Sequence, residues 1–279
     1  ARYGYDPIET PILNPAETIL GKYGVEGDRL TYNFEDNGKR RLALPYDLTV
    51  PFARYFAANW KELPLPFKRY QIQRVWRGEK PTKGRLREFY QCDIDVIGTE
   101  SLIAEAEVAR VITTVFTELR FKNFQIKTNS RRLMNDILRT FAVPKDKSMD
   151  AIRVIDKLAK IGEAVVIEEL EKLKIANAKE LIEAIKPETS TKETLQKLKN
   201  YDTSEIETLL DYCKILGVSE ELIDFDPSLA RGLDYYTGII YEVVSLDNSD
   251  LGSLCAGGRY DNLCGLFCTE SFSGMGVAF

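Results

Sequence analysis

The chain has 279 residues, a net charge of −5, and 44% hydrophobic residues. This length and apolar content predict a globular protein with one large domain, or one domain with an insert. The acidic balance excludes nucleic-acid binding through bulk charge, so any contact with phosphate must come from a local cluster of cations.

The chain contains no histidine and five cysteines. The absence of histidine excludes Ser-His-Asp and Cys-His mechanisms, which leaves carboxylates, arginines, tyrosines or the substrate to carry any chemistry. The cysteines form no C-x-x-C pair, so we predict reduced thiols and no metal ligands. No apolar run approaches the roughly 20 residues of a membrane span, and no secretory signal opens the sequence. We therefore expect a cytoplasmic protein without a membrane partner.

The first 60 residues predict an extended segment, a hairpin and a helix. Pro7, Pro11 and Pro15 in "YGYDPIETPILNP" break any regular helix,. The stretch "RLTYNFEDNGKRRLALPYD" has two alternating runs joined across Asn37 and Gly38, a pair that suits the positive-φ positions of a tight turn,. The following "LTVPFARYFAANW" is typical of a helix.

Two further strands, "FKRYQIQRVWR" and "REFYQCDIDVIG", are predicted to pair in antiparallel fashion across a cationic loop,. The loop contains Arg77, Lys80, Lys83, Arg85 and Arg87. It lacks the G-x-x-x-x-G-K-[ST] order of a P-loop, and "SGMGVAF" lacks the third glycine of a dinucleotide fingerprint, so neither common nucleotide fold fits.

Alternation along the second strand places a cation, a ring, an amide and two carboxylates on one face, namely Arg87, Phe89, Gln91, Asp93 and Asp95,. Such a face suits a polyphosphate, a base and an amine. A solvated sheet face would alternate in the same way, so this pattern alone does not decide between the two.

From residue 101 the pattern changes to that of helices. An apolar stripe recurs at spacings of three and four, in Leu102, Ala106, Ala109, Ile112, Phe116 and Leu119,. Lysine and glutamate dominate from about 131 to 224, and β character returns in "GLDYYTGIIYEVVSL". We predict an α+β fold in which an antiparallel sheet flanked by helices, residues 1–130 and 225–279, is interrupted by an all-helical subdomain at 131–224.

Two late segments combine tyrosines, arginines and glycines: "SLARGLDYYTGIIYE" and "AGGRYDNL". Adjacent tyrosines are common in ordinary strand packing, and adjacent glycines in bulges and turns. Glycine doublets also let a backbone approach a ligand closely. The residues alone leave both interpretations open.

Taken together, these motifs resemble those of the histidyl-tRNA synthetases, a family of class II aminoacyl-tRNA synthetases, over nearly the whole chain. "YGYDPIETPIL" is similar to the first class II motif and "RVWRGEKPTKGRLREFYQCD" to the second, the hairpin over ATP. "ARGLDYYTG" and "AGGRYDNL" resemble the two histidine signatures of the family, which are the more specific matches. The resemblance implies a class II synthetase-type sheet, with residues 131–224 as the family's insertion domain.

The resemblance also implies residues for ATP. Arg77 matches the arginine that meets the α-phosphate, and Glu79 matches a loop glutamate that contacts the nucleotide. Arg85 would reach the outer phosphates, and Phe89 would stack on adenine. Arg231 matches an arginine that stabilises charge during adenylate formation, so Arg77 and Arg231 are the implied catalytic pair.

The histidine site is implied in the same way. The groups that hold the amino end of histidine match Asp47, Thr49 and Gln91, and bacterial relatives often have glutamate in place of the first. The imidazole readers match Asp95 and Tyr236. The pocket is shaped by residues that match Tyr235, Gly257, Gly258 and Tyr260, and Arg231 borders it.

The implied function is ligation of histidine to tRNA in translation. ATP with Mg²⁺ would activate L-histidine to histidyl-adenylate, which transfers to tRNA(His), and class membership suggests a homodimer. The alternatives are a regulatory subunit of ATP phosphoribosyltransferase and a module that senses uncharged tRNA, both without catalysis. The family's third motif continues past "GMGVAF" and an anticodon-binding domain normally follows, so we expect part of a longer protein, with weak activation at best.

Overall fold

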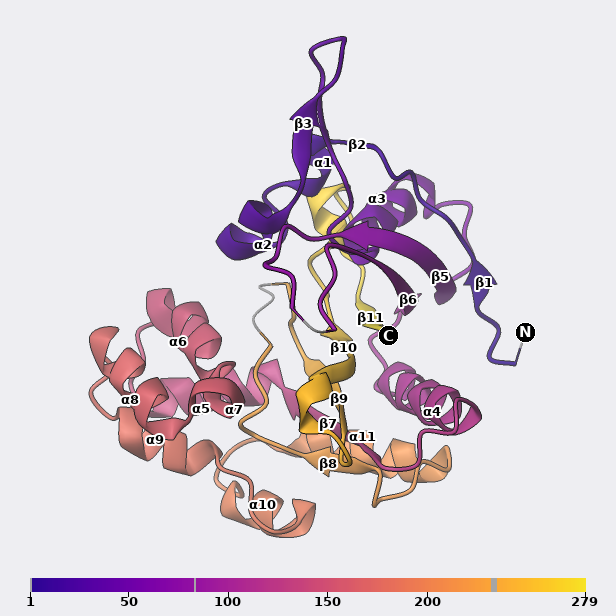
Figure 1. Cartoon of the computed structure of the whole chain (residues 1–279). Coiled ribbons are helices and arrows are strands. Elements are labelled where there is room, and N and C mark those ends of the chain that lie inside the picture. Colours follow the sequence, from indigo (N-terminus) through magenta and orange to yellow (C-terminus); the bar gives the residue numbers. More distant parts are fainter. Residues whose placement is uncertain (1, 83, 232–234) are drawn as a thin grey trace. The chain divides into compact units, whose positions relative to one another are not determined.

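A computed structural model describes residues 2–82, 84–231 and 235–279 (Figure 1). Lys83 of the cationic loop and Gly232, Leu233 and Asp234 of the first histidine signature lie outside the described residues. The chain forms two compact units. The described parts of the first are residues 2–82, 84–101, 235 and 259–279, and those of the second are 102–231 and 236–258.

The first unit contains short helices and two groups of strands. Its elements are β1 (Asp6–Pro7), β2 (Asn14–Pro15), α1 (Ala16–Ile19), α2 (Gly24–Leu30), β3 (Asn33–Glu35), β4 (Arg41–Ala43), α3 (Thr49–Asn59), β5 (Phe67–Trp76), β6 (Glu88–Ile97), η3 (Cys264–Leu266) and β11 (Gly274–Ala278). Four of the strands lie in the order β1, β5, β6, β11. β1 is parallel to β5, whereas β5, β6 and β11 pair in antiparallel fashion.

The long pair β5 and β6 confirms the predicted strands on either side of the cationic loop. Its register runs from Phe67 opposite Ile97 to Trp76 opposite Glu88, without a bulge. Side chains alternate between the two faces of each strand. One face therefore carries the polar residues discussed below.

The predicted hairpin also forms, between β3 and β4. Its turn differs from the prediction, because the positive φ lies at Lys39 (60°) and not at the Asn37-Gly38 pair. The Asp36 side chain holds the turn by accepting hydrogen bonds from the backbone N–H groups of Gly38 and Arg40, at 2.9 and 2.8 Å. A local side-chain cap thus sets the turn geometry.

A hydrophobic core covers one side of this sheet. Phe52 and Phe56 on α3, whose predicted helix is confirmed, pack against Phe67 of β5 at ring-centroid distances of 6.2 and 6.3 Å. Phe272 meets Phe56 edge to face at 5.1 Å. Aromatic pairs of this kind contribute about 0.5–1.5 kcal/mol beyond their buried area. The core anchors α3, which begins at the predicted site residue Thr49.

The second unit has its own strands and most of the helices. Its elements are α4 (Ile103–Glu118), β7 (Phe124–Ser130), α5 (Arg131–Thr140), η1 (Lys145–Lys147), α6 (Ser148–Ile155), α7 (Leu158–Ile161), α8 (Glu163–Lys172), α9 (Ala178–Ile185), α10 (Thr191–Lys197), α11 (Ser204–Ile215), β8 (Ile223–Phe225), β9 (Ile239–Ser245), η2 (Ser249–Leu251) and β10, which begins here and ends in the first unit (Ser253–Arg259). The strand order is β10, β9, β7, β8, with only β7 and β8 parallel.

The apolar stripe predicted from residue 102 is largely confirmed on α4. Ala106, Ala109 and Ile112 are fully buried, and Phe116 packs on Phe124 of β7 at 5.1 Å. Leu119 departs from the prediction, because it follows the end of the helix and is 67% exposed.

The predicted fold class is confirmed as α+β. The sheet prediction needs one refinement, since two strand pairs are parallel. Between 131 and 222 the described elements are helices, α5 to α11 with η1, as Figure 1 shows. The division into 1–130, 131–224 and 225–279 stays a prediction, because compactness divides the chain at other positions. In the described part of the chain, no helix combines the length and apolar character needed to cross a membrane.

Candidate functional site

A row of buried polar side chains follows one face of β6. Gln91, Asp93 and Asp95 are only 7%, 1% and 1% exposed. Burial of carboxylates is costly unless they are paired and hydrogen-bonded. The surroundings of this row therefore show what the face is built for.

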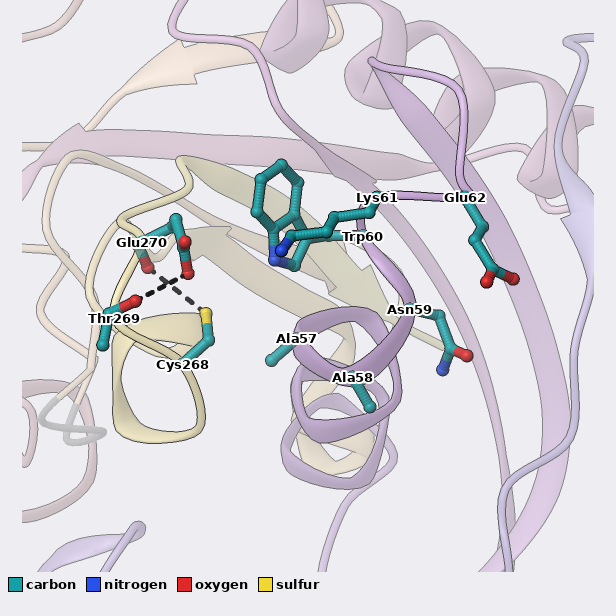
Figure 2. Close-up of a pocket in the computed structure, with 9 residues that line it drawn as sticks. All are labelled: Ala57, Ala58, Asn59, Trp60, Lys61, Glu62, Cys268, Thr269 and Glu270. Atoms are coloured by element: carbon teal, nitrogen blue, oxygen red, sulfur yellow. Dashed lines mark hydrogen bonds between the residues drawn. The ribbon is translucent and has the colours of Figure 1, made fainter.

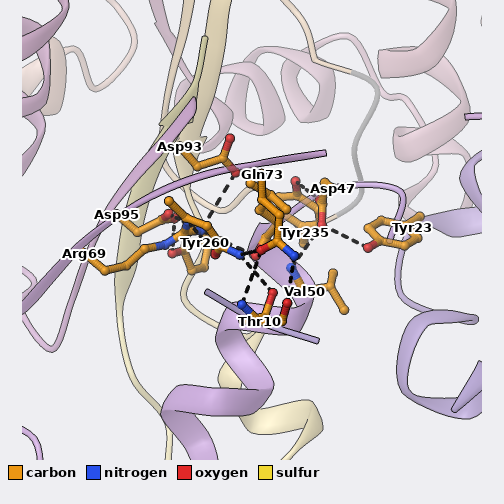
Figure 3. A network of polar contacts seen from close by, with 12 residues as sticks. Thr10, Tyr23, Asp47, Val50, Arg69, Gln73, Asp93, Asp95, Tyr235 and Tyr260 are labelled. Atoms are coloured by element: carbon orange, nitrogen blue, oxygen red, sulfur yellow. Dashed lines mark hydrogen bonds and ion pairs between the residues drawn. The ribbon is translucent and has the colours of Figure 1, made fainter. Parts of the chain in front are cut away.

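Asp95 lies between two neighbouring strands that accommodate its carboxylate differently. Across β5 it faces Arg69, whose Nη2 lies 2.6 Å from Asp95 Oδ2. Across β11 it faces Gly276, where a Cβ would come within 2.0 Å of Asp95 Oδ1. Tyr260 donates its hydroxyl to the same Oδ1 at 2.5 Å. Figure 3 shows Arg69, Asp95 and Tyr260 directed toward one another.

Asp95 Oδ2 is in ion-pair contact with Arg69 Nη2, and the carboxylate oxygen can accept a further hydrogen bond,. Gln91 Oε1 and Asp93 Oδ1 are buried without a hydrogen bond among the described residues. Buried acceptors are normally satisfied. Together with Asp95, these acceptors on one strand face indicate a place for a ligand that donates hydrogen bonds.

Asp47 forms a second buried acidic position, just before α3. Its Oδ1 accepts from the Val50 backbone N–H at 3.0 Å and from the Tyr23 hydroxyl at 2.9 Å. Its Oδ2 accepts from Tyr235 at 3.3 Å. The unpaired N–H groups at a helix N-terminus favour a carboxylate there. Asp47 is thereby fixed in place, and Thr49 follows as the first residue of α3.

The acidic groups are held in an environment that opposes their ionisation. Burial raises the pKa of Asp47 and Asp95, and it raises the pKa of Asp93 well above its ordinary value. The Arg69 guanidinium counteracts this by lowering the pKa of Asp93 and Asp95. Burial also raises the pKa of Tyr23 and Tyr260 far enough that both phenols stay hydrogen-bond donors. A cationic ligand would relieve the excess of negative charge in this cluster.

Arg77 lies at the end of the same sheet face, held by two rings. Its Cζ is 4.5 Å from the centroid of Tyr46 and 5.1 Å from that of Phe89. Its Nε donates to the Tyr46 carbonyl at 3.1 Å. These contacts fix the guanidinium and leave its terminal nitrogens as donors suited to a phosphate.

The remaining loop residues predicted to contact ATP form a partly exposed ion pair. Arg85 Nη1 lies 3.0 Å from Glu79 Oε2, and the Arg85 side chain is 60% exposed. Arg87 donates to the Glu79 carbonyl at 3.1 Å. In water this pair is weak, so Arg85 is available to an incoming anion.

Four of the predicted site residues belong to the second unit. Arg231 Nη1 lies 3.0 Å from Glu242 Oε1, and its carbonyl accepts from Arg131 at 2.5 Å. Tyr236 is 8% exposed. Gly257 and Gly258 pair with Tyr241 and Ile240 of β9. A Cβ on Gly258 would come within 3.0 Å of the Tyr236 ring and 2.7 Å of the Ile239 carbonyl, so only glycine fits there,.

A separate pocket of about 440 Å³ lies in the first unit, near the end of α3 (Figure 2). It is lined by Ala57, Ala58, Asn59, Trp60, Lys61, Glu62, Cys268, Thr269 and Glu270. Its polar groups partly pair among themselves, since Thr269 donates to Glu270 at 2.9 Å. None of the predicted site residues lines this pocket, and the candidate site is the acidic face with Arg77.

Comparison with known proteins identifies the family of this chain. The family model for histidyl-tRNA synthetase matches residues 1–279. The chain belongs to the histidyl-tRNA synthetase family. It is 40% identical over 290 residues to a histidine–tRNA ligase of Treponema denticola, and 40% identical over 291 residues to one of Helicobacter pylori. These matches cover 99% of the chain but 64% and 65% of the relatives, so the chain spans about two thirds of their length.

Solved structures agree with this membership. A histidyl-tRNA synthetase from Nostoc superposes with a TM-score of 0.87 and 35% identity, over the whole chain and 66% of that protein. A protein from Bacillus halodurans, described as an ATP phosphoribosyltransferase regulatory subunit/histidyl-tRNA synthetase, gives a TM-score of 0.81 at 22% identity over 99% of this chain and 73% of its own. At that identity the likeness shows the fold alone. The regulatory interpretation gains no support from it.

Within the first unit the structure brings together several residues that are distant in sequence. Asp47 meets Tyr235, Asp95 meets Tyr260, and Arg77 meets Phe89. Their roles, and the convergence of the second-unit residues with them, stay predictions. The sequence reasoning missed Arg69, Tyr23 and Gly276. The alternation in "FKRYQIQ" was a signal for Arg69, because it places this residue on the same strand face as Gln71. No sequence signal indicated the strand register that places Arg69 opposite Asp95.

Proposed function

We propose that this chain is the catalytic core of a histidine–tRNA ligase, which activates L-histidine with ATP and transfers it to tRNA(His). The observation that carries the proposal is the acidic face on β6, in which buried Asp93 and Gln91 keep acceptor atoms without hydrogen bonds and Asp95 can accept a further one,. Family membership and the fixed Arg77 guanidinium support the same reaction.

The acidic face suits an amino acid that is rich in N–H donors. The α-ammonium group would lie against Asp47, Thr49 and Gln91. An imidazole N–H would donate to Asp95, with Tyr236 on the other ring nitrogen and with Tyr235, Tyr260, Gly257 and Gly258 shaping the cavity. A site built from buried polar partners rejects ligands that leave those partners unpaired, which gives strong selection for histidine.

The cationic loop suits ATP, with Mg²⁺ arriving as part of the MgATP substrate. Arg77 would contact the α-phosphate, and Phe89, beside it at 5.1 Å, would stack on adenine. Glu79 would contact the nucleotide, which would free Arg85 from its ion pair to reach the outer phosphates. A planar guanidinium can contact a phosphate group through two parallel hydrogen bonds.

The reaction requires positioning and charge neutralisation more than proton transfer. A carboxylate oxygen of histidine attacks the α-phosphorus, the bond to the bridging oxygen breaks, and pyrophosphate leaves, which gives histidyl-adenylate. Arg77 and Arg231 would stabilise the charge on the α-phosphate as that bond forms. The ribose hydroxyl of the terminal adenosine of tRNA then attacks the acyl carbon and releases AMP.

The wider setting of the enzyme is part of the same proposal. Translation enzymes of this family act in the cytoplasm, and enzymes of the class form homodimers. The proposal therefore includes a cytoplasmic location and a homodimer for this protein.

The decisive experiment is ATP–pyrophosphate exchange with the full-length protein. We expect exchange that depends on L-histidine and falls to background with each of the other amino acids. Absence of exchange, together with tRNA binding and intact folding, would overturn the proposal in favour of a sensor.

A further inference from the structure

Arg69 is a fully buried arginine that has no part in the function proposed above. It lies in the middle of β5 and is 0% exposed. Its strand partner is Asp95, the residue assigned to imidazole recognition. A buried guanidinium is expensive to keep, so a strand position that only needs to fill space would carry an apolar residue.

The guanidinium of Arg69 is held from several sides. Its Cζ lies 4.4 Å from the centroid of the Phe52 ring on α3. Its Nη1 donates to Gln71 Oε1 at 3.1 Å, and its Nη2 donates to the Leu48 carbonyl at 3.4 Å. Gln71 is itself fixed by bonds to Thr10 and Gln73, at 2.9 and 2.5 Å. The position of Arg69 is therefore set by neighbours other than the acids.

From this fixed position Arg69 contacts both acids of the β6 face. Nη2 is 2.6 Å from Asp95 Oδ2 and 3.8 Å from Asp93 Oδ2. Tyr260 fixes the other oxygen of Asp95, and Gly276 leaves the space that this carboxylate occupies. Asp95 is thus held between a guanidinium, a phenol and a glycine. Oδ2 contacts Arg69 Nη2 and, as a carboxylate oxygen, can accept a further hydrogen bond,.

We propose that Arg69 is a positioning residue for amino-acid recognition, which holds the Asp95 carboxylate in the orientation in which it accepts a hydrogen bond from the side chain of the bound amino acid. This inference rests on the proposed function for the identity of that amino acid. The geometric part, that Arg69 controls Asp95, does not depend on it.

The electrostatic surroundings give Arg69 a second effect on the same group. Burial raises the pKa of Asp95, while Arg69 and the Tyr260 hydroxyl lower it. Three other titratable groups lie near Asp95. The charge of Asp47 raises the pKa of Asp95. The charge of Asp95 in turn raises the pKa of Asp93 and of Cys264. A protonated Asp95 would lose acceptor capacity toward an imidazole N–H. Arg69 therefore also preserves the acceptor state of Asp95.

The first test reads Asp95 directly and needs no catalysis. The pKa of Asp95 is followed by carbon NMR of labelled aspartate carboxyl groups in the full-length protein, with Asp95→Asn to assign the signal. Because an opposite charge at this range lowers a carboxyl pKa by about one unit or more, Arg69→Met is expected to raise the pKa of Asp95 by at least that amount. Arg69→Lys keeps the charge and should restore most of the shift.

The matched variant is Arg69→Met combined with Asp93→Asn. Arg69→Met alone leaves the two buried carboxylates of Asp93 and Asp95 without their cationic partner and risks unfolding,. The double variant removes one positive and one negative charge, so the net charge of the cluster is unchanged. We expect it to fold, with the pKa of Asp95 higher than in Asp93→Asn alone, because the two proteins differ only in Arg69. An Asp95 signal that titrates as in Asp93→Asn alone would overturn the proposal.

The second test measures ligand affinity by calorimetry, with L-histidine and ATP as separate probes. We expect the double variant to bind histidine about 30-fold more weakly or worse, and ATP within about threefold of the parent, as for the loss of one charge-assisted contact. Arg69→Lys should recover part of the histidine affinity. Equal losses for both ligands would contradict a positioning role. A parent protein that binds no histidine would overturn the proposed function, while the NMR result would still decide whether Arg69 controls Asp95.

Discussion

Two groups of charged residues, one in each unit, differ in their burial. In the first unit, Arg69, Asp93 and Asp95 lie almost wholly inside the protein, at 0%, 1% and 1% exposure. On α8 of the second unit, the side chains of Lys172 and Glu168 form an ion pair at 2.7 Å and are 68% and 63% exposed.

Exposed and buried ion pairs differ in what they contribute to stability. Exposed pairs add little to stability because water and salt screen them and because long side chains lose entropy when they pair. Buried pairs carry a large desolvation cost, which apolar residues of similar volume would avoid. The proposed binding role would account for the acidic face of the first unit in spite of this cost, and four predictions test the contrast.

The largest effect is expected from Asp95→Ala. Loss of a buried, charged acceptor should raise the KM for histidine by about 100-fold or more, because the ligand N–H would then be desolvated without a partner. The KM for ATP should change little. Exchange kinetics of the full-length protein with each substrate varied in turn check this, and equal losses in histidine and ATP affinity would refute the assignment.

A smaller but still large effect is expected from Gly276→Ala. The added Cβ would lie within 2.0 Å of Asp95 Oδ1, so the carboxylate must move. A displacement of about 1 Å in a recognition group can cost about 100-fold, and we expect a 10- to 100-fold loss of histidine affinity by calorimetry. Gly265→Ala is the matched control, because a Cβ at Gly265 meets nothing within 4 Å. Similar losses in the two variants would argue against this mechanism.

Asp93→Asn is expected to change stability in a pH-dependent direction. Burial raises the pKa of Asp93 well above its ordinary value, so the folded state binds this proton more tightly than the unfolded state. The resulting cost to folding is absent below the unfolded pKa and complete above the folded one. The variant should therefore gain about 1 kcal/mol of unfolding free energy near pH 8, a gain that disappears near pH 4.

Denaturant titrations without ligand, at several pH values, measure this gain. The prediction would be wrong if the variant were less stable than the parent near pH 8 and equal to it near pH 4. That result would show that ionised Asp93 stabilises the fold through Arg69.

The smallest effect is expected from the exposed pair on α8. A double-mutant cycle with Lys172→Ala and Glu168→Ala should show no coupling above experimental error in thermal unfolding. A coupling as large as the effect of Asp93→Asn would remove the distinction between buried and exposed charges.

Much of the local structure followed from the sequence. Period-two alternation predicted β5 and β6, and spacings of three and four predicted α4, because these patterns depend only on which side chains must leave water. The hairpin was predicted but its turn was not, since the Asp36 side chain moved the positive φ to Lys39. Motif resemblance selected Asp95 and Tyr260, whose contact the structure then showed.

What the sequence determined by itself is the family, the α+β class and the set of polar residues on one strand face, because periodicity and motifs are local properties of the chain. Only the tertiary structure decided that Arg69 and Gly276 lie on either side of Asp95. Strand register across an 11-residue loop, and pairing with a strand near residue 276, depend on the packing of the whole unit. Neighbouring residues in the sequence do not encode them.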